Sequence, residues 1–218
     1  MVINYWPLLF ALVLLWFPRQ WLRMGGKVFS LRHHRRHHRT AEAGSDHDQL
    51  DISLKAREEF LKSRNWVDLI RAIVGSLAIS YACFENADAT KQADLGIFVL
   101  QCTVLGIAVL IQTLRFEGRF SLVAPVFFIL GLSFGPIGWQ GGLFAGVTIW
   151  TLNLVLPAPG VFLLVFACVE ICFGLLLSRV PLRFTLLAAS LAILPVLLSA
   201  VTKHRLVRFS KKTKHVRA

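Results

Sequence analysis

The chain has 218 residues, of which 56% are hydrophobic, and its mean hydropathy of +0.62 lies far above that of an ordinary soluble domain. The net charge of +12 is concentrated in two stretches, residues 19–39 and residues 202–218, each with seven Lys and Arg and no acid. Basic stretches beside apolar segments are typical of the cytoplasmic flanks of membrane helices. Composition and charge therefore argue against a soluble domain and against nucleic acid as a partner.

The N-terminal region, residues 1–17, contains one short apolar segment at residues 3–17. The segment lacks a basic n-region and a small-residue cleavage site, which predicts that it is retained rather than removed as a signal peptide. Trp6 and Trp21 bracket it at positions that suit the two membrane interfaces. We expect it either to cross the membrane or to lie in the interface as an anchor.

Residues 18–65 form the only long polar stretch, which we expect to be cytoplasmic. Its sequence LRHHRRHHRT, residues 31–40, places His33 and His37 four residues apart, a spacing that suits a metal ion on a helix. The interleaved arginines repel a divalent cation, so the pattern favours a basic strap; a metal site completed by Asp46, His47 and Asp48 is the alternative. We predict no metal and no cofactor. The predicted ligands are anionic lipid headgroups or an acidic protein partner, bound by Arg32, His33, His34, Arg35, Arg36, His37, His38, Arg39, Lys211, Lys212 and Lys214.

A second element is expected within the same polar stretch. Leu50, Leu54 and Leu61 fall near one face of a helix over residues 49–63, with charged side chains opposite. This pattern predicts an amphipathic helix on the membrane surface or against the bundle.

Residues 66–201 are almost continuously apolar and predict a six-helix membrane bundle. Runs of 17 to 25 apolar residues match a bilayer core of about 30 Å, and the breaks between the runs are short. The expected fold is an all-α, polytopic bundle of six or seven spans, depending on residues 3–17, with successive spans antiparallel. The predicted spans are residues 66–84, 94–114, 120–137, 140–156, 160–178 and 183–201.

The distribution of Lys and Arg predicts the orientation of the bundle. Most of these residues become cytoplasmic if residues 18–65, 115–119, 157–160 and the basic tail 202–218 lie inside. Lys91, Arg179 and Arg183 then lie outside, and the last two make the loop at 178–183 the discordant element. This assignment predicts a cytoplasmic C-terminus, and we expect the membrane to be a bacterial inner membrane.

Glu170 is the one acid deep within a predicted span, where an unpaired charge is costly. One reading is a proton or cation site, and the other is a protonated carboxyl bonded to a neighbouring helix. The candidate intramembrane polar site comprises Glu170, Asn153, Gln101 and Arg71. Asp68 and Arg71 lie three residues apart, which predicts a local ion pair. The alternatives are that the Arg71 side chain extends to the lipid headgroups or points inward towards Glu170.

Glycines recur at intervals of four residues in two neighbouring segments. Small residues at this spacing let helix backbones approach closely in a membrane. They predict either packing within the bundle or a seam with a second copy or a partner protein. The residues are Gly131, Gly135, Gly138, Gly142 and Gly146.

The sequence contains no catalytic template such as G-x-S-x-G, H-E-x-x-H or a Walker A motif, so no catalytic residue is predicted. The four cysteines fall in apolar segments without C-x-x-C spacing, which favours buried thiols. The first expectation is a non-enzymatic membrane subunit or scaffold with a basic face for lipid or a partner. A small transporter that uses Glu170 is the alternative, and a lipid-modifying enzyme at the cytoplasmic face is third.

Overall fold

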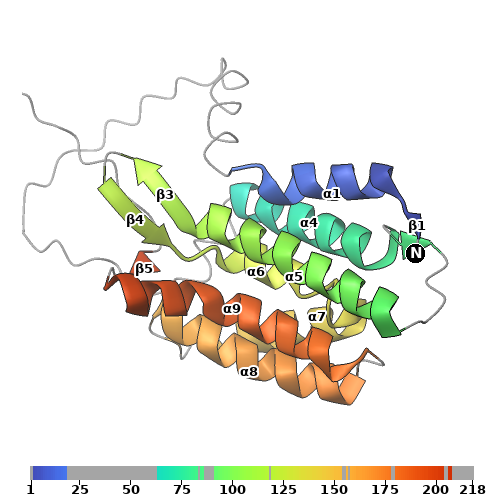
Figure 1. Cartoon of the computed structure of the whole chain (residues 1–218). Helices are drawn as coiled ribbons and strands as arrows, with labels where there is room; N and C mark the ends of the chain where they lie inside the picture. The colour runs from blue at the N-terminus through green and yellow to red at the C-terminus, as the bar shows by residue number, and fades with distance from the viewer. Residues whose placement is uncertain are drawn as a thin grey trace, which may run out of the picture.

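The computed structural model describes residues 2–18, 63–82, 84–85, 91–117, 119–153, 156, 158–177, 180–203 and 206–207. In these residues the chain forms seven α-helices, one π-helical turn and five short strands (Figure 1). The predicted helical bundle is confirmed as a mostly helical fold, whereas the expectation of an all-α protein missed two small sheets. The histidine cluster, the basic tail beyond residue 207 and the predicted helix over residues 49–63, apart from Ser63, lie outside the described residues.

The helices account for most of the described chain and run roughly along one common direction (Figure 1). They are α1 (Tyr5–Trp16), α4 (Ser63–Leu77), the π-helical turn η1 (Ala78–Ala82), α5 (Lys91–Thr113), α6 (Val126–Leu132), α7 (Gly138–Leu152), α8 (Pro159–Leu177) and α9 (Leu182–Thr202).

The short helix α6 is the centre of the bundle, and all of its residues are buried. It contacts α4, α5, α7 and α9, and the outer helices follow one another around it in the order α4, α1, α5, α9, α8 and α7. This order differs from that of a simple up-and-down bundle, because α5 packs chiefly against α9 and α1. Helix α5 therefore lies between α1, the first helix of the chain, and α9, the last.

Two small sheets lie at opposite ends of the bundle (Figure 1). At one end, β1 (Val2–Ile3) pairs antiparallel with β2 (Phe84–Glu85). At the other end, β3 (Leu114–Glu117) pairs antiparallel with β4 (Arg119–Val123), and β5 (Leu206–Val207) pairs parallel with β4. We call these the β1–β2 end and the β3–β5 end. The second sheet fixes the residues that follow α9 beside the hairpin between α5 and α6.

Four predicted spans coincide closely with observed helices: 66–84 with α4 and η1, 94–114 with α5, 160–178 with α8, and 183–201 with α9. Within the described residues, three stretches are long and apolar enough to cross a membrane: Leu95–Thr113, Pro159–Leu177 and Leu182–Thr202. The remaining predicted crossings stay predictions, and α7, with 15 residues, is about 22 Å long.

The prediction of one helix over residues 120–137 is wrong. The segment begins in β4, and its helix α6 has only 7 residues. Pro125 explains the late start, because proline lacks a backbone N–H and disfavours a helical conformation in the residue before it. After α6 the chain turns through residues 133–137 and reaches Gly138, whose positive φ of 75° permits the reversal into α7. Residues 126–152 therefore form a helical hairpin rather than one span and part of the next.

Candidate functional site

Helix α4 has its polar side turned towards the interior of the bundle. Asn65, Asp68 and Arg71 are buried, whereas Trp66 and Ile70 on the opposite side are exposed. A helix on the surface of a soluble protein shows the reverse arrangement. Polar side chains that face the inside of the bundle are expected where lipid, rather than water, surrounds it.

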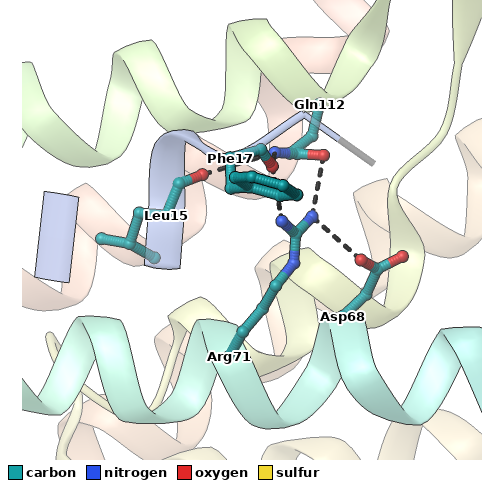
Figure 2. A network of polar contacts seen from close by, with 5 residues as sticks. All are labelled: Leu15, Phe17, Asp68, Arg71 and Gln112. Atoms are coloured by element: carbon teal, nitrogen blue, oxygen red, sulfur yellow. Dashed lines mark hydrogen bonds and ion pairs between the residues drawn. The ribbon is translucent and has the colours of Figure 1, made fainter. Parts of the chain in front are cut away.

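The first buried polar group is the Arg71 cluster, which consists of Asp68, Arg71, Gln112 and the carbonyl groups of Leu15 and Phe17 (Figure 2). The Arg71 guanidinium donates hydrogen bonds to the Phe17 carbonyl and, over 2.9 Å, to Gln112 Oε1. It also forms an ion pair with Asp68 at 2.9 Å, as expected from their spacing. The cluster joins α4, α5 and the end of α1.

The Arg71 cluster satisfies the carbonyl groups that α1 leaves free where it ends. The last carbonyls of a helix have no partner within that helix. Gln112 Nε2 donates to the Leu15 carbonyl at 3.3 Å and to the Phe17 carbonyl at 2.9 Å. The Arg71 guanidinium also lies 5.1 Å from the centre of the Phe128 ring of α6, a cation–π contact. Arg71 is thereby held inside the bundle, where it is 7% exposed, and none of these contacts is with Glu170.

The second buried polar group lies where α6 ends. The Glu170 side chain of α8 is 1% exposed, and it shares a hydrogen bond with the Ser133 hydroxyl at the end of α6. The second carboxyl oxygen, Oε2, has no hydrogen-bond partner. We call Glu170 and Ser133 the Glu170 pair.

Serine hydroxyls complete the hydrogen bonding of this helix end. Ser133 Oγ donates to the Leu130 carbonyl at 2.7 Å. The hydroxyl hydrogen of Ser76 in α4 is shared between the Ile73 carbonyl at 3.1 Å and the Gly131 carbonyl at 3.2 Å. The interruption of the helix at the centre of the bundle therefore leaves the Leu130 and Gly131 carbonyls hydrogen-bonded, as buried backbone groups require.

A third hydroxyl lies one helical turn from Glu170. Gly174 follows Glu170 by four residues on the same buried face of α8, which is about 6 Å along the helix axis. A Cβ atom at Gly174 would come within 2.7 Å of Thr185 Oγ1 on α9. This hydroxyl is buried and has no hydrogen-bond partner.

The four residues of the predicted intramembrane site are all buried, but they do not form one group. Arg71 belongs to its own cluster, and Glu170 pairs with Ser133. The side-chain oxygen of Gln101 in α5 has no partner, nor do the two side-chain polar atoms of Asn153 after α7. No hydrogen bond or ion pair connects any two of the four. Sequence reasoning missed Gln112, Ser133 and Thr185, whose signal was a polar side chain within an apolar segment.

The five predicted packing glycines have different surroundings. Cβ atoms at Gly131 and Gly135 would collide with backbone atoms of α4, and one at Gly142 would collide with Phe134 in the same hairpin. Gly138, with its positive φ, begins α7 directly after the turn, and Gly146 has only an ordinary contact at 3.9 Å. The close approaches therefore lie within this chain.

Cys168 and Cys172 point outward from α8, and Cys102 is partly buried. The described residues contain no group of three or more His, Cys, Asp or Glu side chains that would hold a metal ion. Of the residues predicted to bind anionic lipid or a partner, none falls in the described part of the chain.

Comparison of the chain with protein-family models, curated proteins and solved structures gave no match. The class of protein therefore follows from the fold itself. The long apolar helices and the inward-facing polar side chains define a membrane-embedded helical bundle.

Proposed function

We propose that the protein is a multi-pass, non-enzymatic membrane subunit or scaffold whose basic end binds anionic lipid headgroups or an acidic protein partner. The observation that carries this proposal is the position of the residues from which the two basic stretches continue. Helix α1 ends at the β3–β5 end, where strand β5 also lies (Figure 1), and the basic stretches follow α1 and α9 in the sequence. Two basic stretches that start at one end favour a single charged face, with that end in the cytoplasm.

Exposed aromatic residues at the opposite end support a membrane crossing of the whole bundle. Tyr5 and Trp6 are exposed in the first turn of α1, Tyr81 is exposed in η1, and Trp139 is exposed in the first turn of α7. Tyr81 lies beside the start of α7, because its hydroxyl is 3.7 Å from the Cβ position of Gly138, the residue before Trp139. Trp and Tyr are enriched where a membrane protein meets the headgroups. We therefore propose that the β1–β2 end lies at one membrane–water interface. The proposal includes six or seven membrane crossings by the chain.

Gentle detergent extraction of the full chain, affinity purification and mass spectrometry test this proposal. A companion protein in fixed ratio, or enriched anionic lipid, is the expected result. Replacement of Arg32, Arg35, Arg36 and Arg39 by Gln should weaken retention of the bound species roughly a hundredfold or more, at about 1 kcal/mol per basic residue. The matched control is Lys91→Gln with Arg179→Gln. Equal retention by the arginine variant would contradict binding by the basic face.

A second candidate function is transport of a proton or a cation, and the Glu170 pair favours it. An intramembrane acid beside a break in a central helix is an arrangement found in ion and proton pathways. The test is flux in vesicles that contain the purified protein: Glu170→Gln should abolish it. Unchanged flux in this variant would remove the candidate.

A further inference from the structure

We propose that the Glu170 pair is a proton-binding site, in which Glu170 holds a proton at neutral pH, donates it to Ser133 Oγ and exchanges it along the seam between α8 and α9 past Thr185. The proposal deepens the transport candidate by naming its ligand, but the site can exist without transport.

The hydrogen bonding of Ser133 supports a protonated Glu170. A serine hydroxyl has one hydrogen and two acceptor positions. Ser133 Oγ uses its hydrogen in the 2.7 Å bond to the Leu130 carbonyl. Towards Glu170 the hydroxyl therefore has only acceptor positions left, so a protonated Glu170 carboxyl group supplies the hydrogen of the bond that joins the two side chains.

The surroundings of Glu170 also favour the neutral carboxyl. The neighbouring side chains on its face of α8, Phe166 and Ala167, are buried and apolar. The C-terminal end of a helix carries a partial negative charge, and Ser133 is the residue that ends α6. A carboxylate beside such a helix end would be repelled, whereas a carboxyl O–H group suits it.

The donor atoms at the site suit a proton better than a metal ion. Hard cations require a shell of several oxygen ligands. Here the Ser133 oxygen already bonds with Leu130 and Glu170, and the second carboxyl oxygen of Glu170 is the one buried oxygen atom of the pair without a partner. One unpartnered oxygen can accept a hydrogen bond but cannot enclose a cation.

Thr185 supplies the next exchangeable group towards the β1–β2 end. It lies in the first turn of α9, and α9 begins at that end of the bundle (Figure 1). Its hydroxyl is unpartnered, and its methyl group and hydroxyl both lie against Gly174, one turn from Glu170. Because Gly174 has no side chain, no Cβ atom separates this hydroxyl from the α8 backbone.

Infrared spectroscopy of the full-length protein in lipid tests the protonation state. A carbonyl band of a protonated carboxyl should persist at neutral pH and disappear in Glu170→Gln, whose amide has a similar shape and also donates. Ser133→Ala should shift the band, because the carboxyl loses its acceptor. The matched control, Glu117→Gln in the β3–β4 hairpin, should leave the band unchanged. Absence of a Glu170-dependent band at neutral pH would overturn the proposal.

The exchange of this band in heavy water tests the route. Thr185→Val keeps the side-chain shape but removes the hydroxyl, so exchange should slow at least tenfold. Thr202→Val, at the other end of α9, is the control, because Thr202 Oγ1 is engaged with the Leu198 carbonyl. An unchanged exchange rate in Thr185→Val would contradict the route past Thr185. If the band behaves as expected but Glu170→Gln leaves flux unchanged, the proton site stands and the transport candidate fails.

Discussion

Arg71 shows how one side chain stabilises the junction of three helices. Its guanidinium bonds at once with the Phe17 carbonyl, Gln112 and Asp68 (Figure 2). Arginine suits this position because its planar fork of donors serves several acceptors simultaneously, which a lysine ammonium on a flexible stem does less well. The arginine that pairs with Asp68 therefore also donates a hydrogen bond to the Phe17 carbonyl at the end of α1.

We predict that Arg71→Met lowers the free energy of unfolding in detergent by about 3 kcal/mol or more, because it removes one partner of the buried ion pair with Asp68. Arg71→Lys should lose less, since the charge remains. Asp68→Asn combined with Arg71→Met should recover only part of the loss, because the Phe17 carbonyl still lacks the arginine donor. Equal stability of Arg71→Met and the wild type in thermal or denaturant unfolding would contradict this role.

The same cluster shows what sequence can predict at the scale of single residues. The Asp68–Arg71 pair followed from a spacing of three on one helix. Gln112 and Ser133 did not, because their partners, Phe17 and Glu170, lie far away in the sequence. A polar residue in an apolar segment can be recognised, but its partner depends on which helices become neighbours.

At the scale of elements, α4 and α6 approach so closely that only glycine fits at Gly131. A Cβ atom there would lie 2.5 Å from the Leu69 carbonyl oxygen and 2.7 Å from the Ala72 Cβ atom. Both obstacles belong to or adjoin the backbone of α4, so neither can rotate away. The glycine spacing read from the sequence thus coincides with a contact between two helices of this chain.

Gly131→Ala should destabilise the protein by about 1–3 kcal/mol, since the two helices must separate to admit the methyl group. Gly146→Ala is the matched control: its Cβ position meets only Leu130 at 3.9 Å, and alanine favours the helix, so stability should be unchanged or rise by up to about 1 kcal/mol. Thermal unfolding in the same detergent compares the two. A smaller loss for Gly131→Ala than for Gly146→Ala would refute this account of the seam.

The segment over residues 120–137 shows why one element was mispredicted. Apolar composition does not separate a buried strand from a buried helix over a short run. Pro125 was a signal that the helix begins late, and the change of direction after α6 depends on Gly138. By contrast, α5, α8 and α9 were predicted closely, because length and composition define an apolar helix that must satisfy its own backbone in lipid.

At the scale of the whole molecule, the bundle has two chemically distinct ends. The β3–β5 end holds the start of α4 and the end of α9, while the β1–β2 end holds the end of α8 and the start of α9 (Figure 1). The sequence predicted the same division from Lys and Arg alone, with residues 115–119 and 202–218 on one side and the loop at 178–183 on the other. The β4–β5 pairing brings the first two of these stretches together.

This arrangement predicts which positions are accessible from each side of the membrane. In a chain whose four cysteines are replaced by alanine, Ser30→Cys and Thr213→Cys should react with a membrane-impermeant maleimide only after the membrane is opened. Ser178→Cys, which follows α8 directly in the sequence, should react in intact right-side-out vesicles if the β1–β2 end faces outward, as we propose. Labelling of Ser30→Cys and Thr213→Cys from different sides would contradict the common basic face. Labelling of both from outside would keep that face but reverse the orientation, and would place the exchange route past Thr185 on the cytoplasmic side.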